Sequence, residues 1–297
     1  MLDHGHMVPK KILLATDLSC RCDRALDRAT ILAQEWGAQL VVVHALQSPS
    51  GGEDLPSWRS RADPRLVAWR RVQQDLREAH KVDVQIVVER EDPAALVLTT
   101  AERHHCELII TGIARDETLG RVILGTTVER LLHQSATPLL VVKRRPRAPY
   151  SDVVVATDFS EGSRRALEAA LALVPDEAQL GLFHAFDVPY RGLIHDQAAA
   201  REAWSKDAVR ECQVFLAATP GIAESRRLIG TQCESGSVVS LLLELLETRD
   251  IDLVAMGTEG RGYLGSRLLG SVALNLLNNL PVDMLVTRRT PASGDGR

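Results

Sequence analysis

Hydrophobic positions along the chain follow two patterns, short apolar runs and longer segments with an apolar residue every three or four positions. Residues 11–16 form a short apolar run, as in a buried strand. In residues 20–36 the apolar side chains share one helical face, and Gly37 stands where such a helix ends. The same patterns predict strands over 39–46, 82–88, 107–111 and 138–142, and helices over 64–80, 93–105 and 126–134.

Strands that alternate with helices in this way favour an α/β fold, a parallel sheet with helices on both faces and right-handed crossovers. Ser19 is expected to cap the first helix, and Asp92 followed by Pro93 is a typical helix start. Ligands of open parallel sheets bind beyond the carboxyl ends of the strands. We therefore look for functional residues where the predicted strands end.

The pattern occurs twice. KILLATDLS at 11–19 recurs as DVVVATDFS at 152–160, and the pair HA at 44–45 recurs at 184–185. ELIITG at 107–112 recurs as DLVAMG at 252–257, and LGT at 124–126 recurs as LGS at 269–271. The repeat predicts two tandem copies of one domain, 1–146 and 147–297, joined near the basic, proline-bearing stretch 143–149.

Composition narrows the class of protein. The 297 residues are 45% hydrophobic and 25% charged with a net charge of −4, so there is no basic field for nucleic acid. No apolar run has the length of a membrane span, and the amino terminus lacks a signal-peptide core, so a cytoplasmic protein without a membrane partner is expected.

The cysteines are expected to be reduced thiols. The five are Cys20, Cys22, Cys106, Cys212 and Cys233, an odd number without paired C-x-x-C spacing. A metal or oxidant-sensing role for 20–22 or 104–106 stays open as the minor alternative.

A glycine-dense loop stands out in residues 255–276. Gly257 ends an apolar run, Gly260 lies in the loop, and Gly270 with Ser271 opens a new helix. Glycine lets an anion approach backbone N–H groups, and a helix amino terminus suits phosphate, with Ser271 expected as its N-cap. An ordinary strand–loop–helix connection is the alternative. The chain contains no G-x-x-x-x-G-K-[ST] sequence, the pattern of a Walker A loop.

The spacing of this loop, G-2x-G-9x-G-S, resembles the ATP-binding motif of the universal stress protein family. The resemblance covers 11 to about 289 in two copies. It implies, for each copy, a five-stranded parallel sheet in the order 3-2-1-4-5, an adenine nucleotide alpha hydrolase-like fold. It also implies that the second copy binds ATP.

The resemblance implies that particular residues of the second copy contact the nucleotide. Asp158, at the strand end with Ala156 and Thr157, would accept hydrogen bonds from adenine or ribose; capping the next helix is its alternative. The Ala185 backbone would contact adenine, while His184 is expected to be a hydrogen-bonded core residue. The phosphate and ribose contacts would come from Gly257, Gly260, Gly270, Ser271, Val272 and, unless it is solvated, Arg261. Magnesium, if bound, would be held chiefly by phosphates and water.

The first copy departs from the motif. Asp17, Gly112, Gly125 and Thr126 are in register, but Arg115 takes the place of the second glycine. A side chain there would crowd the nucleotide or disfavour the backbone angle, so we expect an empty or weakened site. The alternative is that Arg115 reaches toward a phosphate.

The resemblance also implies partners. The family pairs the last strand across an antiparallel dimer contact, so 138–142 and 282–287 are expected to pair the two copies within the chain, with a homodimer as a further option. No catalytic residue is identified, because G-x-S-x-G, H-E-x-x-H and similar patterns are absent.

The leading hypothesis is a stress-response protein that uses ATP to regulate an unknown protein partner, with 47–63 and 187–197 responding to the nucleotide. A scaffold that binds no nucleotide and a slow adenine-nucleotide hydrolase are the alternatives. The sequence leaves open the stress, the partner, ATP against ADP or AMP, and the oligomeric state.

Overall fold

The computed structural model describes residues 8–19, 22–46, 63–76, 82–115, 122–187, 196–222, 227–258 and 269–288. The chain divides into two compact units, 9–148 and 149–297 with 1–8, which we call the first and the second unit. Most of 47–63 and 187–197, and the loop positions Gly260 and Arg261, lie outside the described residues.

The first unit is a five-stranded parallel sheet in the order β3-β2-β1-β4-β7. Its elements are β1 (Lys11–Ala15), α1 (Asp23–Trp36), β2 (Gln39–Ala45), α2 (Pro64–Asp75), β3 (Val84–Glu89), α3 (Pro93–His104), β4 (Leu108–Gly112), β5 (Ala114–Arg115), β6 (Val122–Ile123), α4 (Thr126–Gln134) and β7 (Leu139–Val142). The short strands β5 and β6 pair separately as an antiparallel ladder.

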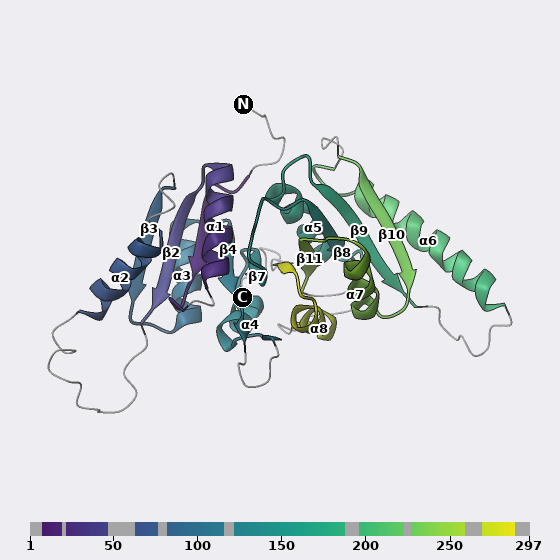
Figure 1. The fold of residues 1–297 in the computed structure, drawn as a ribbon. Coiled ribbons are helices and arrows are strands. Elements are labelled where there is room, and N and C mark those ends of the chain that lie inside the picture. Colours follow the sequence, from purple (N-terminus) through teal and green to yellow (C-terminus); the bar gives the residue numbers. More distant parts are fainter. Residues whose placement is uncertain are drawn as a thin grey trace, which may run out of the picture. The chain divides into compact units, whose positions relative to one another are not determined.

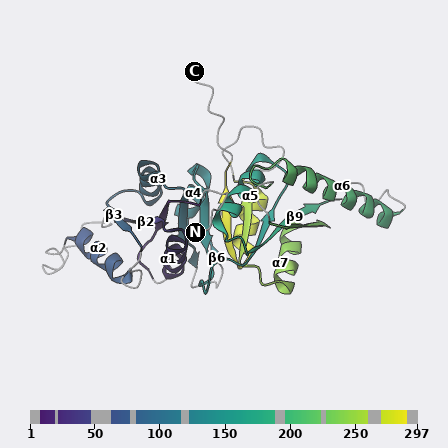
Figure 2. The ribbon, with the colours of Figure 1, turned by 90° about the horizontal axis from the view of Figure 1, so that it is seen from above.

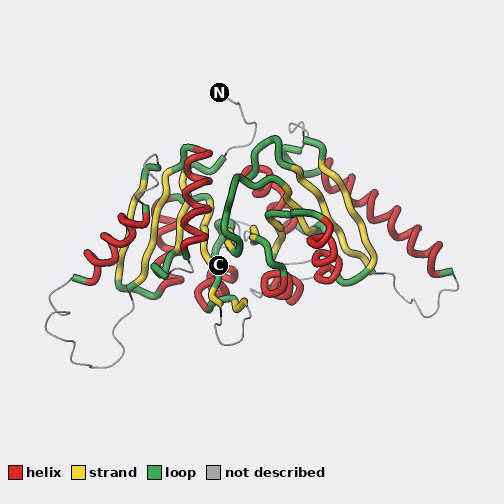
Figure 3. The backbone as a smooth tube through the Cα atoms, viewed as in Figure 1, coloured by secondary structure: helices red, strands yellow, loops and turns green. Residues whose placement is uncertain are grey.

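The second unit repeats this order as β10-β9-β8-β11-β12, again all parallel. Its elements are β8 (Asp152–Ala156), α5 (Glu161–Leu173), β9 (Gln179–Phe186), α6 (Gln197–Ala217), β10 (Ile229–Ser235), α7 (Val238–Thr248), β11 (Leu253–Gly257), α8 (Ser271–Asn279) and β12 (Asp283–Thr287). Strands alternate with helices throughout (Figures 1 and 3). The predicted fold class and the strand order 3-2-1-4-5 are confirmed in both units.

Helices cover both faces of each sheet. In the first unit α1 packs on β1 and β4, whereas α3 packs on β1 and β2 and contacts α4. In the second unit α5 packs on β8, β11 and β12, α6 packs on β9 and β10, and α7 contacts β9 and α8. Figure 2 shows α5 and α6 on one side of β9 and α7 on the other. Because both faces are covered, successive residues such as Ile12, Leu13 and Leu14 are all fully buried.

Local signals explain most element ends. Gly37 adopts a left-handed conformation with φ of 62° after α1. Asp92 accepts a hydrogen bond from the N–H of Ala95, and Pro93 is the first residue of α3. These predictions are confirmed.

The predicted N-cap at Ser19 is wrong. The helix α1 begins at Asp23, and Cys22 precedes it without a side-chain cap. The reason is a turn in which Cys22 N–H bonds to Ser19 O at 2.9 Å, while Asp17 Oδ1 accepts from Ser19 N–H at 2.9 Å. In the second unit Ser160 does cap its helix, since its Oγ accepts from Ser163 N–H at 3.3 Å.

The first turn of α5 lies directly against the end of β11. A β-carbon added at Gly257 would stand 2.6 Å from Gly162 C and 2.8 Å from Ser163 N. Thr287 Oγ1, on β12, donates to Gly162 O at 3.0 Å and holds the same turn. Gly257 therefore has a packing reason to be glycine that the sequence did not indicate.

We predict that Gly257→Ala lowers the free energy of unfolding of the second unit by at least about 2 kcal/mol, because the methyl group meets backbone that cannot rotate away. Gly230→Ala is the matched control, since nothing lies within 4 Å of its added β-carbon. Urea unfolding followed by circular dichroism measures both. Equal stability of the two variants would contradict the packing.

Cys22, Cys106, Cys212 and Cys233 are free thiols. Burial raises the pKa of Cys22 to about 11, and it raises the pKa of Cys106 to about 11 as well. Cys212 Sγ and Cys233 Sγ lie 3.4 Å apart between α6 and β10, a contact that their spacing in the sequence did not indicate.

We predict that Cys22 and Cys106 react with iodoacetamide about a hundredfold more slowly at pH 8 in the folded protein than in urea, because a pKa near 11 instead of 9.0 depletes the thiolate. Since both pKa values are raised on folding, their contribution to stability is present below about pH 9 and is lost as the pH rises toward 11. Peptide mapping by mass spectrometry follows each site. Equally fast labelling of folded and unfolded chains would rule out this burial effect.

Candidate functional site

A cavity of about 350 Å³ lies beyond the carboxyl ends of β8, β9 and β11 and reaches the start of α8. Its lining residues are Ala156, Thr157, Asp158, Ser163, Ala185, Val238, Met256, Gly257, Thr258, Gly270, Ser271, Val272, Ala273 and Leu276. The position is the one that parallel sheets offer to ligands, where the order of connections reverses.

The structure brings together most of the residues that the sequence singled out in the second copy. Eight of the ten line the cavity, namely Ala156, Thr157, Asp158, Ala185, Gly257, Gly270, Ser271 and Val272. The other two, Gly260 and Arg261, lie outside the described residues. Their contact with a ligand stays a prediction.

A hydrogen-bonded network fixes Asp158 at the cavity. Its Oδ1 accepts from Ser160 N–H at 3.1 Å and from Ser163 Oγ at 3.1 Å. Ser163 Oγ in turn accepts from Thr157 Oγ1 at 3.1 Å. Asp158 therefore binds its own turn, while the capping of α5 falls to Ser160. Its carboxylate is held in place before any ligand arrives.

The turn after β8 also brings two aromatic rings together. Phe159 has a left-handed backbone with φ of 62°, and its ring centroid lies 4.3 Å from that of His184. His184 Nδ1 is within 2.8 Å of Thr157 O. His184 is thus hydrogen-bonded as expected, but it is only partly buried and is not a core residue. His44 repeats this contact in the first unit, with Nδ1 2.9 Å from Thr16 O.

The helix α8 begins at the cavity with no side-chain cap. The expected N-cap at Ser271 is wrong, because Gly270 occupies that position with φ of −61° and ψ of 145°, and Ser271 is the first helical residue. Leu274 N–H makes the first helical bond, to Gly270 O at 3.0 Å. The N–H groups of Ser271, Val272 and Ala273 precede that bond, so the α-helix itself gives them no acceptor. These three residues line the cavity.

Thr258 is a polar residue that sequence reasoning missed. It is 4% exposed and lines the cavity, and its Oγ1 has no hydrogen-bond partner among the described residues. A buried hydroxyl without a partner costs stability unless a ligand or water supplies the bond. The repeat places Ile113 at the equivalent position of the first unit, and this contrast was the available signal.

Five further lining residues were also missed: Ser163, Val238, Met256, Ala273 and Leu276. The apolar ones among them belong to hydrophobic segments whose ordinary function is packing, so the sequence gave no reason to separate them from the core. Ser163 follows Ser160 by three positions at a helix start, which could have indicated its place.

The first unit keeps only part of this arrangement. Asp17 Oδ1 accepts from Cys22 Sγ at 3.0 Å, so Cys22 takes the place that Ser163 has in the second unit. Gly112 ends β4, while Gly125 precedes α4 in an extended conformation and Thr126 is its first residue, as in the second unit. Arg115 lies in β5, paired with Val122, so its backbone forms a short ladder where a loop was expected.

These observations agree with a comparison against known families. The model of the universal stress protein family matches residues 9–143 and again residues 149–288. The chain belongs to the universal stress protein family. Its two units are tandem universal stress protein domains, as the glycine motif and the repeat predicted.

A universal stress protein of Mycolicibacterium smegmatis is 25% identical over 303 residues, which cover 93% of this chain and 96% of that protein. The crystal structure of a universal stress protein from Archaeoglobus fulgidus DSM 4304 shares the fold with a TM-score of 0.67 at 19% identity, and covers 95% of this chain and 99% of that chain. Another solved universal stress protein, in complex with cAMP, is 25% identical over 47% of this chain and 98% of its own, with a TM-score of 0.33.

Two further properties concern the described residues of this universal stress protein. No cluster of three or more His, Cys, Asp or Glu side chains in the described ranges is arranged to hold a metal ion. Within the same ranges, every helix is too short or too polar to cross a lipid bilayer.

We predict that Thr258→Val raises the free energy of unfolding by about 1 kcal/mol, since it removes a buried hydroxyl without a partner and keeps the shape. Thr157→Val is the matched control and lowers stability, because Thr157 Oγ1 accepts from Phe159 N–H at 2.9 Å. Thermal and urea unfolding measure both. A loss of similar size in both variants would mean that Thr258 Oγ1 is satisfied in solution.

Proposed function

We propose that this universal stress protein binds ATP in the second unit and that the bound nucleotide regulates its association with a protein partner in the cytoplasm during stress. The observation that carries the proposal is the start of α8, where three residues whose N–H groups have no helical acceptor line the cavity and the preceding residue, Gly270, has no side chain. Such a helix end carries a positive partial charge and suits a phosphate group.

The adenosine part would occupy the strand ends. Ala156, Ala185, Val238 and Met256 supply apolar surface for the adenine ring. Asp158 would accept from a ribose hydroxyl or the adenine amino group, which it can do because its turn already holds it in place. Thr258 Oγ1 offers a donor and an acceptor to the same ligand.

The phosphates would continue toward α8. Gly270, Ser271 and Val272 would bind them through backbone N–H groups, and Gly257, Gly260 and Arg261 would complete the site. Among the described lining residues Asp158 is the one carboxylate. Magnesium would therefore enter with the phosphates and water rather than in a protein cage.

Regulation rather than catalysis fits these residues. ATP hydrolysis needs an oriented water and a group that stabilises the charge developing on the phosphoryl oxygens. None of the described lining residues is assigned either role. A nucleotide instead shifts a conformational equilibrium when it binds one state more tightly than the other, and a partner that binds the same state then responds.

The proposal assigns the ligand to the second unit. Ile113 replaces Thr258 in the first unit, and Arg115 stands where the motif has its second glycine. We therefore propose that Asp17, Gly112, Gly125 and Thr126 form at most a weaker site.

We predict that Ser271→Pro weakens ATP binding about tenfold or more, because proline removes one N–H donor to a charged phosphate. Proline is favoured at the first position of a helix, and Gly270 has the extended conformation that must precede it, so α8 is expected to persist. Isothermal titration calorimetry with ATP, ADP and AMP measures the change and ranks the three nucleotides.

Two matched variants serve as controls. Ser271→Ala keeps the N–H, so it is expected to change affinity by less than the proline variant does. Thr126→Pro makes the same change at the start of α4 and is expected to leave ATP binding intact. No ATP binding by the unaltered protein, or equal binding by Ser271→Pro, would contradict the proposal and favour a scaffold that binds no nucleotide. Rapid steady-state phosphate release would favour an enzyme instead.

A further inference from the structure

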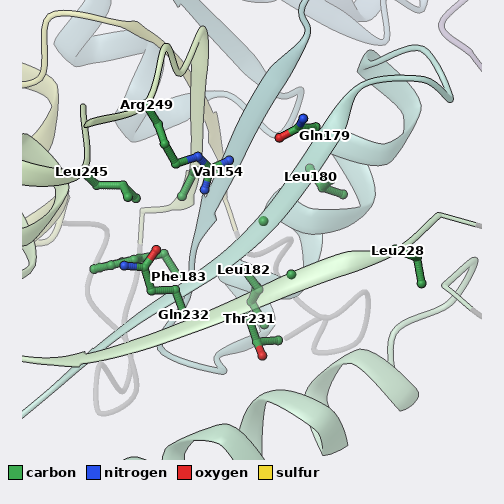
Figure 4. Close-up of a pocket in the computed structure, with 12 residues that line it drawn as sticks. Val154, Gln179, Leu180, Leu182, Phe183, Leu228, Thr231, Gln232, Leu245 and Arg249 are labelled. Carbon is green, nitrogen blue, oxygen red and sulfur yellow. The ribbon is translucent and has the colours of Figure 1, made fainter. Parts of the chain in front are cut away.

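A second groove of about 410 Å³ lies on the sheet of the second unit, away from the carboxyl ends of the strands. Figure 4 shows residues of β8, β9 and β10 beneath it, with Leu245 and Arg249 reaching over them from α7 and the segment that follows it. Its lining includes Gln179, Gly181, Phe183, Gly230, Gln232 and Arg249. None of them lines the cavity proposed for ATP.

Two glycines form the floor of this groove. Gly181 on β9 and Gly230 on β10 are directly paired in the parallel ladder. Neither has a left-handed φ; a β-carbon at Gly181 would meet only ordinary contacts near 3.9 Å, and one at Gly230 would meet nothing within 4 Å. Glycine inside a strand weakens it and often marks a place where a ligand or another backbone approaches closely. Among the described residues there is thus no steric reason for either glycine.

The residues around the floor are partly apolar and partly amide-bearing. Val154 pairs with Gly181 from the other side, and Phe183 with its partner Gln232 lies two residues further along the strands. Gln179 is exposed two residues before Gly181. Side chains two residues apart on a strand point to the same face. The glycine floor is therefore a flat peptide surface with Gln179 at one end and the paired residues Phe183 and Gln232 at the other.

Arg249 supplies a hydrogen-bond donor above this floor. Its Nε donates to Asp152 Oδ2 at 3.2 Å, and its Nη2 donates to Asp152 Oδ1. Its Nη1 lies 3.9 Å from the position of a β-carbon on Gly181 and makes no hydrogen bond to a described residue. Asp152 already neutralises the charge of the Arg249 guanidinium, so the carboxylate of a ligand would be repelled by that of Asp152. An uncharged carbonyl oxygen suits the remaining donor better.

The first unit lacks these features at equivalent positions. By strand register and by the repeat, Val41 replaces Gly181 and Gln85 replaces Gly230. The same alignment puts His104 in place of Arg249 and Lys11 in place of Asp152. Since both sheets have the same strand order, the fold does not require the glycines or the Arg249–Asp152 pair.

We propose that this groove binds a small, flat, uncharged ring that carries a carbonyl group on its edge, such as an aromatic amide or a nucleobase-like heterocycle. The ring lies on the peptide surface of Gly181 and Gly230, and its edge faces Phe183. The carbonyl accepts from Arg249 Nη1, and Gln179 and Gln232 bond the remaining polar atoms. The volume is within the range of small-molecule sites, so a small ligand is favoured over a protein segment.

The test uses benzamide and benzoate as a matched pair of probes on the full chain. Backbone amide NMR spectra are recorded while each probe is added to the protein. We expect benzamide to shift the amide signals of Gly181 and Gly230 with a Kd on the order of 1 mM, as suits so small a ligand. Benzoate is expected to bind several-fold more weakly because of Asp152. Tighter binding of benzoate would overturn the assignment of an uncharged ligand.

The variant Gly181→Val introduces the residue that the first unit has at the equivalent position, and its side chain covers the glycine floor of the groove. It is expected to weaken the binding of benzamide at least tenfold. The melting temperature and the other amide signals are expected to stay unchanged, since a β-branched residue suits a strand. Gln85→Gly, at the first-unit counterpart of Gly230, is the control; because Gln85 is exposed the fold is kept, and benzamide binding is expected to stay unchanged. Absence of shifts at Gly181 and Gly230, or equal binding by Gly181→Val, overturns the proposal. Concentration-dependent self-association mapped to these two amides would also overturn it, because the surface would then belong to a second copy of the chain.

Discussion

The contact between Gly162 and Gly257 holds together the end of the second sheet. With no β-carbon on either residue, the first turn of α5 lies directly on the end of β11, and Thr287 bonds to the same turn from β12. That contact places Ser163 within hydrogen-bond distance of Asp158, and both residues line the cavity. The cavity is thus a product of close strand–helix packing, and its polar residues take their positions from that packing.

Much of the fold could be predicted from the sequence because its signals are local. Short apolar runs bounded by glycine or proline gave the strands, and Gly37, Asp92 and Pro93 gave helix ends that the structure confirms. The repeat then implied that both halves share one topology. Two features escaped prediction for a physical reason. The start of α1 depends on a turn made by Asp17, and the ladder of β5 and β6 depends on pairing between segments whose sequences carry weak strand signals.

Site residues could be predicted from the sequence where the backbone must approach a ligand closely. Residues that reach the site only through the packing of the fold could not be predicted. Glycine spacing pointed to the strand end and the start of α8, because anion binding by N–H groups demands small residues there. Thr258 and Ser163 carry no such spacing, and only their burial and hydrogen bonds mark them. Gly257 shows that a motif residue can also be required by packing. The motif suggested a ligand contact, whereas the structure shows that α5 alone already demands glycine at this position.

The equal strand order of the two units has a consequence for protein engineering. Each half of the chain indicates which substitutions to test in the other, since the two sheets pair their strands in the same register. Exchanging single residues between Gln85 and Gly230, or between Ile113 and Thr258, changes one chemical feature at a time within the same topology. Chimeras of the two halves can therefore separate what the shared architecture supplies from what each copy has added to it.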